Sequence, residues 1–129
     1  MVTDPIGDMI TRLLNAGRAQ HTEARMPFSA MKKTILDILS REGFVGKVSE
    51  SKSMPRELVV AIKYEHKTPR ISGAARVSKP SRRVYMGVNN IRKVRYGYGL
   101  LLLSTPKGVM TDKEAKKEQV GGEALFKIW

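Results

Sequence analysis

The N-terminal segment carries an apolar stripe at helical spacing. Its members recur every three or four positions, as one buried face of a helix requires: Ile6, Met9, Ile10, Leu13 and Leu14. Asp4 suits the N-cap and Pro5 the first helical position, and Gly17 is expected to end the helix. The opposite side of this helix is polar and comprises Asp8, Thr11, Arg12 and Asn15. Any amphipathic helix shows such a polar side, so by itself it indicates only solvation.

A second helix and further strands are predicted next. After a polar loop, Ser29 can cap this helix, and Gly43 stands where a left-handed C-cap belongs. The inner face of the helix is expected to comprise Met31, Ile35, Ile38 and Leu39. Residues 44–48 begin a strand, and residues 57–65 alternate between apolar and polar positions, which predicts another. Two helices with two or three strands make a small α/β unit.

The second half of the chain is predicted to be mostly sheet. The expected order is a strand, a basic turn, a strand, a helical turn and a covered strand, over residues 71–77, 78–83, 84–88, 89–94 and 100–103. Thr111 and Glu114 have the spacing of a capping box, which predicts a short helix that stops at Gly121–Gly122. Residues 124–129 are expected to form a final strand.

These elements predict an α/β (α+β) fold of two small α/β domains packed together. Thr68–Pro69 is the expected boundary, because a proline turn there coincides with a change in charge composition. The N-terminal domain, residues 1–67, would hold two helices and a short sheet. The C-terminal domain, residues 68–129, would be a mostly antiparallel sheet with one short helix.

The net charge and its distribution along the chain indicate the kind of partner that the protein binds. The 129 residues include 24 Lys and Arg against 12 Asp and Glu, a net charge of +12. Residues 66–111 contain no carboxylate, although they include these basic residues: Arg70, Arg76, Lys79, Arg82, Arg83, Arg92, Lys93, Arg95 and Lys107. Such a one-signed segment favours a surface that faces the phosphates of a nucleic acid, with a chance cluster on a solvated face as the alternative.

Several other kinds of chemistry find no support. The chain has no cysteine, so disulfides, thiolate nucleophiles and cysteine zinc sites are excluded. His21 and His66 are far apart with no partner implied, and Gly97-Tyr98-Gly99 lacks the third glycine of a dinucleotide loop. We therefore expect no enzyme, no cofactor and no metal.

Without a long apolar run or a signal peptide, we expect a soluble intracellular protein that binds no membrane.

Residues 99–116 combine a covered strand, two hydroxyls, a lysine–glycine turn and a capped helix start. Hydroxyls at a strand end can meet RNA 2′-OH groups and base edges, and free backbone amides suit phosphate oxygens. Gly121 and Gly122 would allow a second backbone segment to approach closely. A turn and a helix cap alone would explain the same residues equally well.

The segment Ser104-Thr105-Pro106-Lys107-Gly108-Val109-Met110-Thr111-Asp112, followed by Gly121-Gly122-Glu123, resembles the signature of the small-subunit ribosomal protein eight (S8) family. Residues 4–16 resemble that family's opening helix, residues 42–45 the end of its second helix, and residues 76–85 its central turn. Four motifs in the family's order make the resemblance extend over nearly the whole chain.

The resemblance implies a structural constituent of the small ribosomal subunit. Such a protein binds the central domain of 16S rRNA as a primary binder, helps organise the platform during assembly, and works in the cytoplasm or an organelle. The implied partners are this rRNA, neighbouring small-subunit proteins (proteins five and twelve) and, in a regulatory role, the protein's own mRNA. A nonspecific nucleic-acid-binding protein is the competing interpretation, in which salt alone would govern binding.

The resemblance also implies the RNA-binding residues. In the C-terminal domain they are Ser104, Thr105, Lys107, Gly108, Gly121, Gly122 and Glu123, with Tyr85, Arg83, Ser78 and Lys79 nearby. In the N-terminal domain they are Thr3, Asp4, Thr11, Arg12, Asn15, Ser29 and Lys32. Glu123 would be unusual against phosphate, so it is expected to accept from a base amino group or a 2′-OH, or to anchor a basic side chain.

Three residues depart from the family pattern. Pro106 stands where a serine is usual, Leu14 where an arginine is common, and Ser81 where a glycine is usual. Tyr96 and Tyr98, beside basic residues, suggest base stacking, but tyrosines before a buried strand usually pack. We therefore place these two tyrosines outside the predicted site.

Overall fold

The computed structural model describes residues 4–52, 54–92, 94 and 98–129, and the chain forms two compact units, Met1–Ser72 and Gly73–Trp129. Each unit combines helix with antiparallel strands, which confirms the predicted α+β class. The division falls after Ser72. The expected boundary at Thr68–Pro69 is instead a short strand, β5, which pairs with β4 (Tyr64–Glu65) inside the first unit.

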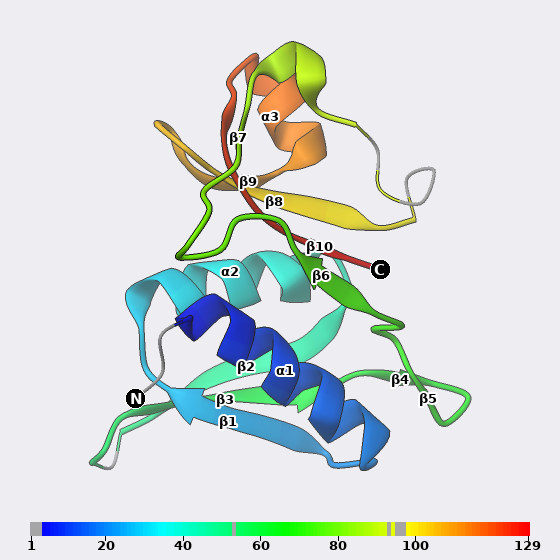
Figure 1. The fold of residues 1–129 in the computed structure, drawn as a ribbon. Helices are drawn as coiled ribbons and strands as arrows, with labels where there is room; N and C mark the ends of the chain where they lie inside the picture. The colour runs from blue at the N-terminus through cyan, green and yellow to red at the C-terminus, as the bar shows by residue number, and fades with distance from the viewer. Residues whose placement is uncertain (1–3, 53, 93, 95–97) are drawn as a thin grey trace. The chain divides into compact units, whose positions relative to one another are not determined.

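The first unit contains two helices and a three-stranded sheet. In chain order these are α1 (Pro5–Arg18), β1 (Glu23–Pro27), α2 (Ala30–Arg41), β2 (Val45–Ser51) and β3 (Glu57–Ile62). The strands pair antiparallel in the order β1-β3-β2. Figure 1 shows both helices over one face of this sheet. The interior is formed by the apolar sides of both helices together with Met26, Leu58 and Val60.

The helix ends follow the sequence only in part. Asp4 caps α1, because its Oδ1 accepts a hydrogen bond from the Gly7 amide at 3.2 Å. Gly17 does not end α1, which continues to Arg18; a Cβ on Gly17 would lie 3.1 Å from the Cβ of Pro69, so the glycine permits close packing there. Gly43 ends α2 as predicted, with a φ of +84°.

Two further differences concern the segment around β1. Residues 23–27, expected to be a polar loop, form an edge strand with only Ala24 and Met26 buried. The inner face of α2 includes Leu36 and Lys32, while Met31 is exposed. The helix is therefore rotated relative to the predicted inner face.

The second unit is a sheet with one helix against it. In chain order it contains β6 (Ala74–Arg76), β7 (Tyr85–Met86), a 3-10 turn η1 (Val88–Asn90), β8 (Leu100–Thr105), β9 (Gly108–Thr111), α3 (Asp112–Glu118) and β10 (Gly122–Ile128). The strand order is β6-β10-β8-β9, and β7 also pairs with β10. Leu100–Leu103 are all buried, which confirms the covered central strand. None of the helices in the described part of the chain is long and apolar enough to cross a lipid bilayer.

The predicted strands at 71–77 and 84–88 are present but shorter. The helical turn expected at 89–94 is the 3-10 turn at 88–90, and Lys93 lies outside the described residues. Thr111 caps α3 by accepting from the Glu114 amide at 3.3 Å. The helix ends earlier than predicted, because Gln119 adopts a left-handed conformation with φ +55°. Gly121 and Gly122 therefore lead into β10 instead of stopping the helix.

Candidate nucleic-acid interface

A hollow opens on the second unit where β7, β8 and β10 meet. It is lined by Tyr85, Met86, Gly87, Ser104, Thr105, Pro106, Gly121, Gly122 and Glu123. Strand register explains the grouping, because Glu123 on β10 pairs with Ser104 on β8 and with Tyr85 on β7. The sheet thus brings together six of the predicted residues, drawn from three separate stretches of the sequence: Tyr85, Ser104, Thr105, Gly121, Gly122 and Glu123.

The glycine pair lets backbone segments meet at the floor of this hollow. A Cβ on Gly121 would stand 2.3 Å from the Met86 carbonyl oxygen, and one on Gly122 would stand 2.2 Å from the Ser104 carbonyl oxygen. Neither contact is possible for a real Cβ atom. Only glycine fits at both positions, so the surface here is backbone with little side-chain cover.

Thr105 and Ser104 use their hydroxyls differently. The Thr105 hydroxyl donates to the Gly108 carbonyl oxygen at 2.7 Å and accepts from the Lys107 amide at 3.1 Å, so it holds the β8–β9 turn. Thr105 is buried, whereas Ser104 is half-buried. Among the described residues, no partner hydrogen-bonds the Ser104 hydroxyl. Ser104 therefore presents the available hydroxyl of the pair.

Two basic side chains flank the hollow. Arg83 donates to Glu123 at 3.1 Å; the Arg83 side chain is 52% exposed and that of Glu123 only 17%. Of the roles expected for Glu123, anchoring a basic side chain is therefore the one present in this structure. On the adjacent turn, Lys107 lies 3.4 Å from Glu118, with both side chains well exposed. Such a surface pair contributes little, so the Lys107 ammonium is accessible to an anion.

The basic turn at residues 78–83 is held from inside by Ser78. The Ser78 hydroxyl accepts from the Val84 amide at 2.8 Å and donates to the Val84 carbonyl oxygen at 3.2 Å. Ser78 is completely buried, so its place near RNA would come from holding this turn in shape. Lys79 and Arg82 exchange backbone hydrogen bonds at 2.8 and 2.9 Å, and both residues are exposed.

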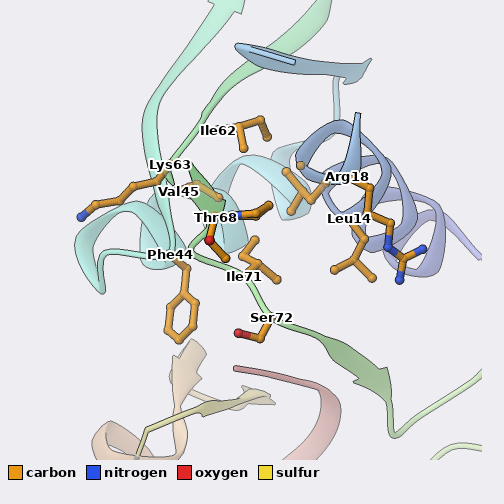
Figure 2. A pocket seen from close by; sticks show the side chains of 12 residues that line it. Leu14, Arg18, Phe44, Val45, Ile62, Lys63, Thr68, Ile71 and Ser72 are labelled. Carbon is orange, nitrogen blue, oxygen red and sulfur yellow. The ribbon is translucent and has the colours of Figure 1, made fainter. Parts of the chain in front are cut away.

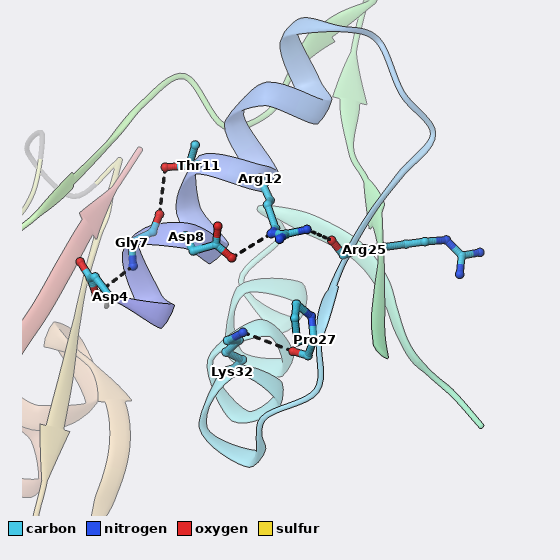
Figure 3. Close-up of polar contacts among 8 residues, drawn as sticks. All are labelled: Asp4, Gly7, Asp8, Thr11, Arg12, Arg25, Pro27 and Lys32. Carbon is cyan, nitrogen blue, oxygen red and sulfur yellow. Dashed lines mark hydrogen bonds and ion pairs between the residues drawn. The ribbon is translucent and has the colours of Figure 1, made fainter. Parts of the chain in front are cut away.

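The predicted residues of the first unit have mostly local partners (Figure 3). Asp4 caps α1, Thr11 donates to the Gly7 carbonyl oxygen at 2.9 Å, and Arg12 contacts Asp8 at 2.8 Å and the Arg25 carbonyl oxygen at 3.1 Å. Asn15 is exposed and shares a shallow hollow with Arg12, and Ser29 is half-buried at the N-cap of α2. Thr3 lies outside the described residues.

Lys32, a predicted RNA-binding residue, is buried in this structure. Only 6% of the residue is exposed, and its ammonium donates to the Pro27 carbonyl oxygen at 3.2 Å (Figure 3). The side chain therefore ties α2 to the end of β1 and does not face solvent. From sequence, a lysine on the first turn of a helix is expected on the outer face, and nothing in the pattern indicated this inward rotation.

Comparison with known proteins decides the family. The family model described as "Ribosomal protein S8" matches residues 4–129. The chain belongs to the ribosomal protein S8 family. It is 48% identical over 132 residues to the small ribosomal subunit protein uS8 of Chloroflexus aurantiacus, covering 99% of this chain and 98% of the relative. It is 42% identical over 130 residues to the uS8 protein of Mycoplasmopsis pulmonis, covering 100% and 98%.

The structure gives a local explanation for the three residues expected to depart from the S8 family pattern. Pro106 precedes Lys107 in the turn between paired Thr105 and Gly108, where a fixed proline φ suits the first turn position. Ser81 has no positive φ, so its turn needs no glycine. Leu14 lines an apolar hollow of the first unit with neighbours that include Ile62 and Ile71 (Figure 2).

The sequence interpretation missed one exposed residue of this S8 family member. Tyr98 was expected to pack because it precedes a buried strand, but it is 82% exposed. Tyr96, given the same expectation, lies outside the described residues. The basic residues that precede Tyr98 in the sequence indicated an exposed, RNA-facing ring. The general tendency of tyrosines to pack was given more weight.

Proposed function

We propose that this chain is a structural, non-catalytic constituent of the small ribosomal subunit and binds the central domain of 16S rRNA as a primary binder. The observation that carries the proposal is the hollow on the second unit, which combines an available Ser104 hydroxyl with a glycine-floored backbone surface. It lies in a chain whose residues 66–111 contain no carboxylate. Membership of the S8 family supports the same role.

Recognition combines shape with a few polar contacts. The wide, shallow minor groove of an RNA helix presents 2′-OH groups and base edges, which suit a hydroxyl and closely approaching backbone. Ser104 supplies the hydroxyl, and Gly121 and Gly122 supply the close approach. Arg83, which contacts Glu123, and Lys107, which follows Pro106, flank the hollow with exposed side chains and neutralise phosphates. Lys79, on the same basic turn as Arg83, is also exposed and adds positive charge. Tyr85, also exposed, offers a ring to the same groove or to a displaced base.

The first unit makes a second, weaker contact with RNA backbone. Arg12 and Asn15 carry this contact, because both are exposed and border one hollow. Through these two contacts the chain helps organise the platform during assembly, beside small-subunit proteins five and twelve. Binding of its own mRNA would use the same hollow on the second unit.

The test is a filter-binding titration against a central-domain rRNA fragment, with a scrambled duplex as competitor, at about 50 and 200 mM salt. Specific binding that survives the competitor at the higher salt supports the proposal. Ser104→Ala should then weaken binding about 5- to 50-fold without changing the urea midpoint, because its hydroxyl holds no part of the fold. Ser49→Ala, which removes an exposed hydroxyl on the first unit, is the matched control. Binding that the competitor abolishes leaves only a nonspecific polyanion binder.

A further inference from the structure

Tyr98 is held at the surface by neighbours that are themselves anchored. The Gly99 amide donates to the Val94 carbonyl oxygen at 3.1 Å, and Val94 is buried. A Cβ on Gly99 would lie 2.7 Å from the Ile128 carbonyl oxygen, so this point of the chain is pressed against β10. Tyr98 itself is 82% exposed. The Tyr98 ring is therefore exposed on a backbone segment whose next residue is anchored to the sheet.

The hydrogen bond between Gly99 and Val94 brings the residue after Tyr98 next to a residue two positions beyond Arg92, so Arg92 belongs to the same part of the second unit. Arg92 is exposed, and its guanidinium donates to the Asn89 carbonyl oxygen at 3.2 Å, with no carboxylate partner among the described residues. The nearest carboxylates in the sequence are Glu65 and Asp112. An exposed aromatic ring and an exposed arginine on the same short segment are the groups that single-stranded nucleic acid binds, by base stacking and phosphate neutralisation.

The position differs from that of the hollow described above. Tyr98 precedes β8, whereas Ser104 and Thr105 lie at the other end of the same strand (Figure 1). At about 3.3 Å per residue, a strand of this length separates the two by roughly 20 Å. One base pair or one displaced nucleotide cannot touch both.

We propose that Tyr98 is a stacking platform for an unpaired RNA base, with Arg92 on a flanking phosphate. The nucleotide would be single-stranded RNA next to the duplex that the hollow binds. This inference rests on the proposed function, since the duplex brings the unpaired nucleotide within reach. The charge favours RNA over a protein surface as the ligand, because a protein partner would need an acidic patch to match the arginine.

The test compares three RNA probes with the intact chain: a blunt central-domain duplex, and the same duplex with a single-stranded extension of about six nucleotides at one end or at the other. The wild-type chain should bind one extended probe more tightly than the blunt duplex. Tyr98→Ser should remove that gain, roughly 5- to 100-fold, while leaving blunt-duplex affinity unchanged. Tyr98→Phe should keep the gain, because stacking needs only the ring.

Tyr85→Ser is the matched control, because Tyr85 is also exposed but lines the hollow. It should weaken all three probes equally. If Tyr98→Ser binds every probe as tightly as wild type, the Tyr98 ring contacts none of these RNAs and the inference is overturned. If wild type binds no probe specifically, the proposed function itself fails. Equal urea midpoints for Tyr98→Ser and wild type would show that the loss of tighter binding to the extended probe is an effect on binding and not on folding.

Discussion

Gly122 and Ser104 approach each other across β10 and β8 so closely that a Cβ on Gly122 would stand 2.2 Å from the Ser104 carbonyl oxygen. The neighbouring residue, Glu123, is the cross-strand partner of Ser104. The same close approach therefore fixes the strand register that places a carboxylate beside a hydroxyl. The strand pairing at Gly122 therefore determines both the stability of the sheet and the arrangement of the groups in the hollow.

Gly122→Ala should damage both stability and RNA binding. The new methyl group would meet backbone that cannot rotate away, so β8 and β10 must separate, at a cost of roughly 1–3 kcal/mol in the free energy of unfolding. Gly87→Ala is the control in the same hollow, because its Cβ would meet only an Asn90 side-chain nitrogen at 3.9 Å. Urea unfolding of both variants measures the difference, and equal midpoints would contradict the close contact.

Ser78→Ala should loosen the basic turn from within. It removes the hydroxyl that hydrogen-bonds both the amide and the carbonyl of Val84, and the partly buried amide left without a partner costs up to about 1–3 kcal/mol. Ser81→Ala changes an exposed serine of the same turn and should leave the unfolding midpoint unchanged. The measurement is urea unfolding, followed by RNA titration of both variants. If Ser78→Ala is as stable as Ser81→Ala, the buried hydroxyl does not hold the turn.

The helices and strands differ in how clearly the sequence marks them. Elements with long apolar runs or standard caps were identified correctly: α1 from its stripe, the end of α2 from Gly43, and β8 from four consecutive leucines. Strand β1 was missed because only Ala24 and Met26 mark its buried face, and an edge strand of that composition resembles a loop.

The site was predictable where residue type and strand position agree. The grouping of Ser104, Gly121 and Gly122 in one site could be predicted by assuming that their segments meet. The strand register brings these segments together. Ser78 and Lys32 could not be assigned from sequence, because serine and lysine are usually exposed and burial depends on how an element is rotated. Their polar atoms are satisfied by nearby backbone, of Val84 for Ser78 and of Pro27 for Lys32, and this pairing depends on how the chain folds back on itself.

Lys32→Ala should affect stability and not the salt dependence of RNA binding. It removes a buried stem and a hydrogen bond to the Pro27 carbonyl oxygen, so we expect a loss of about 1–3 kcal/mol. Lys33→Ala removes a neighbouring lysine that forms an exposed ion pair with Asp37 at 3.0 Å, and should cost roughly 0.3–0.5 kcal/mol. Urea midpoints and RNA affinity at several salt concentrations distinguish the two. A reduced salt slope for Lys32→Ala would mean that its ammonium reaches a phosphate after all.

The pair formed by Arg83 and Glu123 permits a double-mutant test of how the hollow uses its one carboxylate. If Glu123 positions Arg83 for a phosphate, Arg83→Met should weaken RNA binding and lower the salt slope by about 1. Glu123→Gln should also weaken binding, although it removes a negative charge that simple electrostatics would count as repulsive. The double variant should then bind no worse than Arg83→Met alone, because the carboxylate acts only through the guanidinium. Additive losses in the double variant would instead mean that Glu123 accepts directly from a base amino group or a 2′-OH.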